Sequence, residues 1–297
     1  MNEAGIPSYP ATAGGATRGS SGHAAPGCGA PVGYAAAAAQ GGGRTGGSSL
    51  AARIDALSSL ELLDDVAPDA LERLAESTVL RRLDRGRRVR SADQDGRCAF
   101  VVRGRVKKSV PRGASDGELV LDVLGEGDVV SESGWVARDR AFAGDSFALE
   151  TSTLALVGQA ALDRVLAANG TVAKRFLEHL AARLARSVAL AAQNACFQVG
   201  ERLYCRIVEL AVTRGRTTRE GIVVEHGLTQ RELAAFAAAS REIANRQLAE
   251  WKEKGWVEPR RCALVVKDAA ALTHAMPPEV RRVGFGAGDG RGPFRPR

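Results

Sequence analysis

Apolar residues recur along this chain with two different spacings. Between Val79 and Val157, short apolar runs such as CAFVV, ELVLDVL and LALV alternate with turn signals such as Arg103-Gly104 and Asp116-Gly117. Many short strands at regular spacing predict an antiparallel barrel or roll. Ahead of them, Ala67–Ser77 (APDALERLAES) has the three- to four-residue spacing of a short amphipathic helix.

A longer helical pattern follows the predicted strands, from Thr171 to about Phe197. Its apolar stripe comprises Val172, Phe176, Leu180, Leu184 and Val188. A single stripe of this length, lying between two domains, favours packing against the same helix of a second copy. The alternative is a helix that packs only on its own domain.

The C-terminal third has the pattern of a winged helix-turn-helix. The pattern predicts a helix at Gln198–Thr213, a strand in GIVVEHG, helices at Leu228–Ala237 and Ser240–Lys254, a hairpin in VEPRRCALVV with its turn at Pro259-Arg260-Arg261, and a last short helix at Asp268–Ala275. Thr229 and Glu232 have the spacing of a capping box, and Ser240 can cap the second helix. Two short helices joined by a tight bend and followed by a hairpin are typical of this DNA-binding motif.

The second of these helices carries a charged cluster at its start. Ile243, Leu248 and Trp251 are its expected buried side, which leaves Arg241, Glu242, Asn245 and Arg246 on the other side of its N-terminal half. The arginine donor fork matches O6 and N7 of guanine, and a glutamate can accept from N4 of cytosine. The alternative is a solvated helix face with an Arg–Glu pair.

Composition and charge are compatible with a soluble nucleic-acid-binding protein. The net charge is +7, and residues 199–275 hold 13 basic and 10 acidic side chains, so part of the excess lies in the C-terminal third. That bias suits a polyanionic partner. Residues 1–49 are mainly Gly, Ala, Ser and Pro, which predicts a disordered arm.

Several classes of protein are disfavoured by what the sequence lacks. The five cysteines include no C-x-x-C pair, which argues against a zinc or iron–sulfur site and against a disulfide framework, and favours free thiols in a reducing cytoplasm. The chain contains no run of 18 uncharged apolar residues, so no membrane span is expected. The absence of a Ser/His/Asp set, of metal-ligand spacing and of a P-loop argues against an enzyme.

The segment Ser240–Arg246 (S-R-E-x-x-x-R), followed by Leu248 and Gly255-Trp256-Val257, resembles the Crp/Fnr family of bacterial transcription regulators. The resemblance runs from about Leu60 to Ala275. It extends to FVVRGRVK (Phe100–Lys107), LGEGDVVSE (Leu124–Glu132) and ALETSTLALV (Ala148–Val157). It implies a cyclic-nucleotide-binding-type β-roll, a long dimerisation helix and a winged helix-turn-helix.

The resemblance also implies roles for individual residues. Arg241, Glu242 and Arg246 would read the bases of a TGTGA-like half-site. Thr229, Gln230 and Ser240 would be candidate contacts to the DNA backbone. The implied partners are double-stranded DNA, a second copy of the chain and RNA polymerase.

The effector pocket departs from the family pattern. Ser131-Glu132-Ser133 stands where members that bind cyclic AMP have G-E-L. Phe142-Ala143 stands where those members have the phosphate-binding arginine, and Arg140 would substitute only if the loop were re-spaced. Ser131, Glu132 and Arg140 are therefore weak pocket candidates, and no cofactor is expected, although a cyclic nucleotide remains open. Ala238 also replaces the usual glycine of the turn, which costs about 1 kcal/mol if its φ is positive or else requires a rearranged turn.

The expected fold class is α+β: an N-terminal antiparallel β-roll, a long dimerisation helix and a C-terminal winged helix-turn-helix. The expected boundaries are a disordered arm at 1–51, a β-roll sensor domain at 52–168, the dimerisation helix at 169–198, the DNA-binding domain at 199–275 and a flexible basic tail at 276–297. The expected function is a homodimeric, cytoplasmic transcription regulator with an unidentified effector. The alternative is a cyclic-nucleotide-binding module that acts through protein contacts.

Overall fold

The computed structural model describes residues 48–89, 97–112, 117–130 and 145–283 of the chain. Its first elements are α1 (Leu50–Ser58), a short 3-10 turn (Glu61–Leu63) and α2 (Pro68–Glu76). Ser49 caps α1 by accepting a hydrogen bond from the backbone N–H of Ala52 at 3.2 Å. The helix expected at Ala67–Ser77 is confirmed as α2, and Pro68 stands at its start, where a missing N–H costs nothing.

Seven strands then form two antiparallel sheets, as the alternating pattern predicted. One sheet has the order β1-β7-β3 and the other has the order β2-β6-β4-β5. The strands are β1 (Val79–Leu83), β2 (Arg88–Val89), β3 (Arg97–Arg103), β4 (Val106–Pro111), β5 (Glu118–Leu124), β6 (Asp145–Ala148) and β7 (Ser152–Gly158). Phe100, Leu154 and Val157 are fully buried between these sheets and the helices beside them.

The turn between β3 and β4 requires glycine. Gly104 has φ +90°, and a Cβ added there would lie 2.5 Å from Oγ and 2.9 Å from Cα of Ser152. The hydroxyl of Ser152 occupies this space because it accepts from the N–H of Arg105 and donates to the carbonyl of Glu150. The glycine of FVVRGRVK therefore permits β3 and β4 to approach the start of β7.

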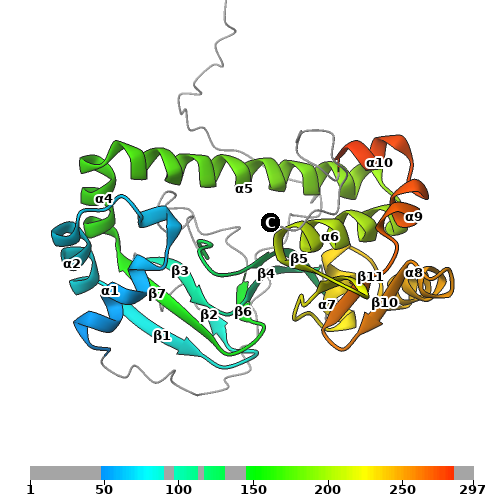
Figure 1. Ribbon diagram of the computed structural model, residues 1–297, viewed down its shortest axis with the longest axis horizontal. Coiled ribbons are helices and arrows are strands. Elements are labelled where there is room, and N and C mark those ends of the chain that lie inside the picture. Colours follow the sequence, from blue (N-terminus) through cyan, green and yellow to red (C-terminus); the bar gives the residue numbers. More distant parts are fainter. Residues whose placement is uncertain (1–47, 90–96, 113–116, 131–144, 284–297) are drawn as a thin grey trace, which may run out of the picture. The chain divides into compact units, whose positions relative to one another are not determined.

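Two helices follow the sheets, α4 (Gln159–Ala168) and the long α5 (Gly170–Cys196), which Figure 1 shows as one unbroken helix. Asn169 caps α5, because its Oδ1 accepts hydrogen bonds from the N–H groups of Thr171 and Val172, each at 3.1 Å. Val172 and Phe176 are buried against the N-terminal core. Further along, Leu177, Leu184 and Val188 are exposed by 67%, 67% and 61%. The predicted helix is confirmed, and only the first part of its apolar stripe is covered by this chain.

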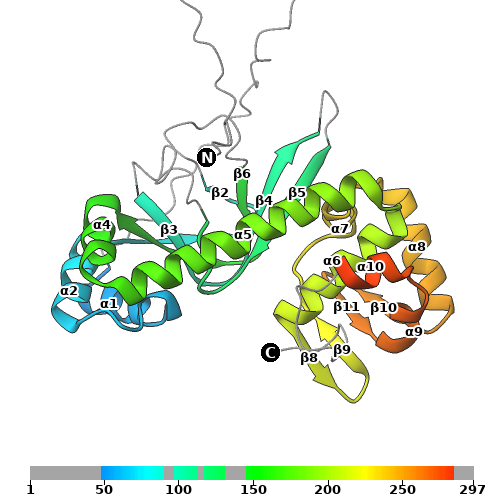
Figure 2. The same cartoon turned by 90° about the horizontal axis from the view of Figure 1, so that it is seen from above.

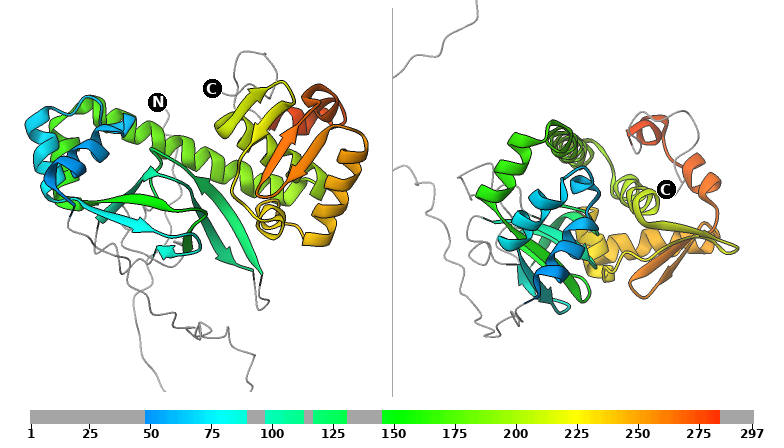
Figure 3. Two further views of the ribbon diagram at one scale, coloured as in Figure 1. Left: turned by 60° about the horizontal axis from the view of Figure 1, so that its bottom comes forward. Right: turned by 60° about the vertical axis from the view of Figure 1, so that its left-hand side comes forward.

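The C-terminal part contains a four-stranded antiparallel sheet in the order β10-β11-β9-β8. Helices precede, interrupt and follow these strands along the chain. Its elements are α6 (Val199–Arg214), β8 (Gly215–Thr218), β9 (Gly221–Val224), α7 (Gln230–Phe236), α8 (Arg241–Glu253), β10 (Val257–Arg260), β11 (Ala263–Val266), α9 (Ala269–His274) and α10 (Pro278–Val283). Figures 2 and 3 show α7 and α8 together, with the strands of this sheet beside α8. This is the expected winged helix-turn-helix, to which the structure adds strand β8.

Two details of the C-terminal part differ from the sequence prediction. Arg260 pairs with Ala263, so the hairpin turn is Arg261-Cys262 and not Pro259-Arg260-Arg261. Pro259 belongs to β10, an edge strand, where a residue without an N–H is tolerated.

The second difference is that helical structure continues beyond Ala275. Residues 278–283 form α10, and Met276 and Val280 are buried in the core that α6 supplies. The prediction of a flexible tail from Met276 is therefore wrong for this segment. The two apolar residues, four apart, give it a face to bury, and Pro278 begins the helix as Pro68 does in α2.

Among the residues that the structure describes, no helix is long and apolar enough to cross a membrane. The same part of the chain contains no group of three or more His, Cys, Asp or Glu side chains arranged to hold a metal ion.

Candidate DNA-binding surface

The first helix of the motif, α7, begins with a complete capping box. The hydroxyl of Thr229 accepts from the N–H of Glu232 at 3.2 Å, and the carboxylate of Glu232 accepts from the N–H of Thr229 at 2.8 Å. The Thr229 hydroxyl also donates to that carboxylate at 2.9 Å. Thr229 and Gln230 are exposed at this helix end. The cap predicted from the T-x-x-E spacing is confirmed.

The bend between the helices uses a left-handed residue. Ala238 has φ +52°, which settles the choice left open by the sequence in favour of an alanine in the conformation usually taken by glycine. The N–H of Ala239 donates to the carbonyl of Ala234 at 2.9 Å, and the N–H of Ala238 donates to that of Ala235 at 3.2 Å. These two bonds are those of a Schellman motif, which ends α7 and redirects the chain within three residues.

The second helix, α8, starts immediately after the bend. Ser240 is its N-cap, and its hydroxyl accepts from the N–H of Ile243 at 3.3 Å. Ala244, Leu248 and Trp251 are buried at spacings of four and three residues. The prediction that Ile243 is buried is wrong, because its side chain is 40% exposed. Successive residues are about 100° apart around a helix. Because Ala244 faces the core, the neighbouring Ile243 is turned toward the exposed side.

The three predicted base-reading residues lie together on the exposed side of α8. Arg241, Glu242 and Arg246 are all exposed. Within the described ranges, neither arginine makes a hydrogen bond or ion pair in the folded chain. Hydrogen bonds from the N–H of Glu242 itself and from the Ser240 hydroxyl lower the pKa of the Glu242 carboxyl, so this group is ionised at neutral pH. The surface thus presents two donor forks and one acceptor.

A buried ion cluster connects α7 to the hairpin formed by β4 and β5. The ammonium of Lys107 donates to a carboxylate oxygen of Glu118 and to one of Glu232, both at 2.6 Å. The Lys107 side chain is only 9% exposed. For Glu232, burial alone would raise the pKa, but the hydrogen bonds from Lys107 and Thr229 outweigh it and the net pKa is lowered. The residue that completes the helix cap is therefore also an anchor for the sheet.

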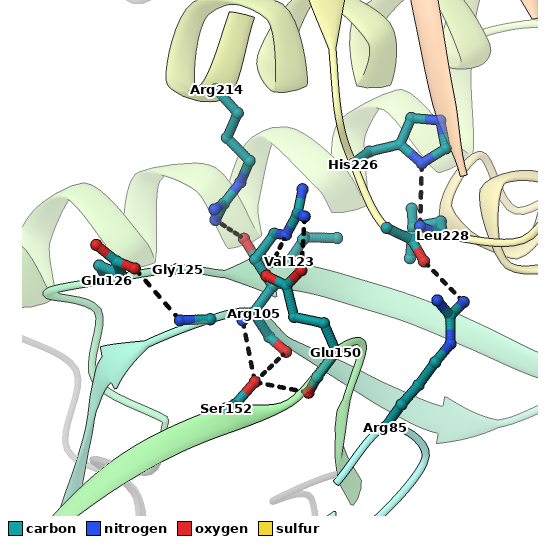
Figure 4. Close-up of polar contacts among 12 residues, drawn as sticks. Arg85, Arg105, Val123, Gly125, Glu126, Glu150, Ser152, Arg214, His226 and Leu228 are labelled. Carbon is teal, nitrogen blue, oxygen red and sulfur yellow. Dashed lines mark hydrogen bonds and ion pairs between the residues drawn. The ribbon is translucent and has the colours of Figure 1, made fainter. Parts of the chain in front are cut away.

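Further polar contacts surround this junction, as Figure 4 shows. Arg105 forms a bidentate pair with Glu150, with both N–O distances 2.8 Å. Arg214 of α6 donates to the carbonyl of Val123 in β5, and Arg85 donates to the carbonyl of Gly227. Sequence reasoning could not identify these partners, because they are separated by 45 to 142 residues.

His226 lies between the end of β9 and the start of α7. It is buried, and its Nδ1 accepts from the N–H of Leu228 at 3.0 Å. Burial, followed by the positive charge of Arg105, lowers the pKa of His226 to about 4. The imidazole is therefore neutral at physiological pH.

A cavity of ≈ 560 Å³ lies between β5, α5 and α6. Its walls include Leu119, Leu121 and Asp122 of β5 and Leu180, Arg183 and Ser187 of α5. The size is that of a small-molecule site. The predicted pocket residues Ser131, Glu132 and Arg140 lie outside the described residues.

Comparisons with known proteins agree with this geometry. Residues 201–275 match the family described as "Crp-like helix-turn-helix domain". A CRP-like cAMP-activated global transcriptional regulator of Mycobacterium tuberculosis is 26% identical over 213 residues, which is 71% of this chain and 94% of the relative.

Two solved structures share the fold. A cyclic nucleotide-binding domain containing protein from Listeria monocytogenes has a TM-score of 0.60 at 18% identity, covering 70% of this chain and 99% of that one. A CooA mutant from Carboxydothermus hydrogenoformans has a TM-score of 0.59 at 18% identity, covering 73% and 94%. With the winged helix-turn-helix, these observations lead to one conclusion: residues 201–275 are a Crp-like helix-turn-helix domain, and the chain is similar over most of its length to CRP-like transcription regulators.

Proposed function

We propose that this protein is a homodimeric transcription regulator that reads a TGTGA-like half-site with α8. The observation that carries the proposal is the exposed trio Arg241, Glu242 and Arg246 on the first two turns of a helix whose opposite face is buried. In a helix-turn-helix, these N-terminal residues of the second helix contact base edges in the major groove.

The chemistry of the trio suits base reading better than phosphate binding. Each arginine offers the planar fork that matches O6 and N7 of a guanine, and Glu242 can accept from N4 of a cytosine. A carboxylate held ionised would repel a phosphate, so its presence argues against a surface that binds only the DNA backbone. Ile243 adds an exposed apolar group able to contact a thymine methyl.

Backbone contacts are assigned to the starts of the two helices. Thr229, Gln230 and Ser240 are exposed there, where free N–H groups and the helix dipole favour an anion. Because the Thr229 hydroxyl already serves the cap, its contribution would come through the helix end. These contacts would fix the orientation of α8 without carrying sequence information.

Dimerisation is proposed to use α5. Leu177, Leu184 and Val188 recur at seven and four residues on one side of this helix and are more than half exposed. Burying them against the same helix of a second copy would form a coiled-coil seam. The dimer would hold two α8 helices about 34 Å apart, one turn of DNA.

The effector is proposed to bind in the cavity beside β5 and α5. Leucines provide apolar walls, and Arg183 and Arg186 provide positive charge beside the carboxylates of Asp122 and Glu209. The M. tuberculosis relative is described as cAMP-activated, but the phosphate-binding arginine of such members is not matched here. A ligand would act by shifting α5 and hence the spacing of the two α8 helices.

The domain assignments that accompany this proposal are a β-roll sensor at 52–168, a dimerisation helix at 169–198 and a DNA-binding domain at 199–275. The protein would act in the cytoplasm, with RNA polymerase as a further partner.

The test is DNA binding by the purified full-length protein to a palindrome of two TGTGA-like half-sites and to a scrambled duplex. Each duplex is measured alone, with cyclic AMP and with cyclic GMP. Tighter binding to the palindrome, lost by about 1–3 kcal/mol in each of Arg241→Ala and Arg246→Ala, supports the proposal. Equal binding to both duplexes under all three conditions, unchanged in the variants, contradicts it.

A further inference from the structure

One side chain outside α8 holds the bend of the helix-turn-helix. Arg202, in the first turns of α6, donates from Nε to the carbonyl of Ala237 at 2.9 Å and from Nη2 to the carbonyl of Ala238 at 3.3 Å. Its Nη1 donates to the carbonyl of Phe197 at 2.5 Å. Ala237 is the C-cap residue of α7, and Ala238 is the left-handed residue of the bend.

The backbone hydrogen bonds of the bend do not use these two carbonyls. The Schellman bonds use the carbonyls of Ala234 and Ala235. The carbonyls of Ala237 and Ala238 instead accept hydrogen bonds from one guanidinium. A planar fork with fixed donor directions fits this pair only while the two carbonyls keep their relative orientation, which the φ and ψ of Ala238 determine.

The electrostatics agree with a structural grip on carbonyls. Burial, followed by the positive charge of Arg112, lowers the pKa of Arg202. No carboxylate in the described part of the chain forms a salt bridge with it, and its three hydrogen bonds to this part all go to backbone carbonyls. A partly buried arginine that donates to three backbone carbonyls restrains the backbone there.

The bend needs such a restraint because alanine disfavours φ +52°. Where a glycine would adopt this conformation freely, Ala238 is held in it by its surroundings. Ser240, two residues later, caps α8, so the torsion of Ala238 sets the direction in which α8 leaves the bend.

We propose that Arg202 is a positioning residue for base reading: it holds Ala238 in the left-handed conformation and thereby aims α8. The same side chain connects the bend to Phe197, the C-cap residue of α5. The inference rests on the proposed function, since it concerns the accuracy with which Arg241 and Arg246 meet their bases.

The test compares Arg202→Lys, Ala238→Gly and the double variant in full-length protein. The measured quantity is the ratio of affinities for the TGTGA-like palindrome and the scrambled duplex. Arg202→Lys keeps the charge but removes the fork, and it is expected to lower the ratio about tenfold, the effect of losing one bidentate base contact. It should leave the salt dependence of binding unchanged, whereas loss of a phosphate contact would change the slope.

The rescue is the decisive arm. Glycine accepts the left-handed conformation without help, so Ala238→Gly in the Arg202→Lys background is expected to restore most of the ratio. Ala238→Gly alone should keep the ratio and raise the Tm by about 2–4 °C. A ratio unchanged in Arg202→Lys, or a double variant no better than it, would overturn the inference.

If Arg202→Lys fails to fold, the single Ala238→Gly variant still decides, since a lowered Tm would contradict a strained bend. Arg241→Ala distinguishes the proposed function from the role of Arg202. If Arg241→Ala keeps the ratio, the proposed function fails; if it loses the ratio and Arg202→Lys does not, only the role of Arg202 fails.

Discussion

At the scale of single residues, His226 shows how burial fixes a protonation state. Its pKa is about 4 in the folded chain, against an ordinary value of 6.5. Below pH 6.5 the unfolded chain binds a proton at this residue that the folded chain does not. The stabilisation is therefore fully present above pH 6.5 and is lost as the pH falls toward 4.

We expect this histidine alone to remove about 2 kcal/mol of stability between pH 7 and pH 5. The measurement is urea unfolding of the native protein and of His226→Asn at both pH values. The amide oxygen of asparagine can still accept from the N–H of Leu228 but does not titrate. The variant should lose about 2 kcal/mol less than the native protein; equal losses would contradict the assignment.

Lys107 is a second residue whose environment predicts a measurable effect. Its ammonium is the shared partner of two largely buried carboxylates. Lys107→Met would leave Glu118 and Glu232 facing each other without it, and removing one partner of a buried ion cluster costs about 3–5 kcal/mol. Lys174→Met is the control, because its pair with Glu178 is exposed and 3.8 Å long, and it should change stability by less than about 0.5 kcal/mol. Similar losses in both variants by chemical denaturation would refute the distinction.

At the scale of elements, the β3–β4 turn depends on Gly104 for two separate reasons. Its φ is +90°, and a Cβ would strike the backbone of Ser152. Gly127 has φ +86° but nothing within 4 Å of a Cβ, so it supplies the matched control. Gly127→Ala should cost about 1 kcal/mol for its backbone strain, and Gly104→Ala should cost at least about 2 kcal/mol more. Thermal unfolding of both variants measures the difference, and equal costs would exclude the steric contribution.

The elements that sequence predicted well are those whose signals are local. The stripe of α5, the capping box of Thr229 and Glu232, and Ser240 at the start of α8 all lie within a few residues of what they determine. Ile243 was predicted on the wrong side of α8. Which side of this helix is buried depends on the elements that pack against it, and the buried residue there is Ala244.

Other features could not be predicted because they depend on distant partners. The carboxylate of Glu232 meets Lys107 across 125 residues of sequence, and Arg202 reaches Ala237 across 35. Helix α10 was missed for another reason: the four prolines and five glycines of residues 276–297 suggested a loose tail, whereas Pro278 begins a helix that buries Val280.

At the scale of the whole molecule, recognition of a palindrome requires two copies of the chain. Leu184→Glu would put a charge in the proposed seam of α5, and we expect a dimer to become a monomer and the affinity for the palindrome to fall by at least about tenfold. Ala182→Glu is the control, since it is exposed on the opposite side of the same helix. Sedimentation analysis gives the mass of each variant. A native protein that is monomeric at all concentrations, or a Leu184→Glu variant that remains dimeric, would contradict the seam.

A cycle of protein and DNA changes tests most directly whether α8 reads bases. Affinities of the native protein, Arg241→Ala and Arg246→Ala are measured for the palindrome and for each single-base change within the half-site. The native protein should discriminate by about 1–3 kcal/mol at the contacted positions. Each arginine variant should become indifferent at one position, a different one for each arginine, and keep its preference elsewhere. Discrimination that survives at every position in both variants, or that falls uniformly across all positions, would show that α8 does not read the sequence.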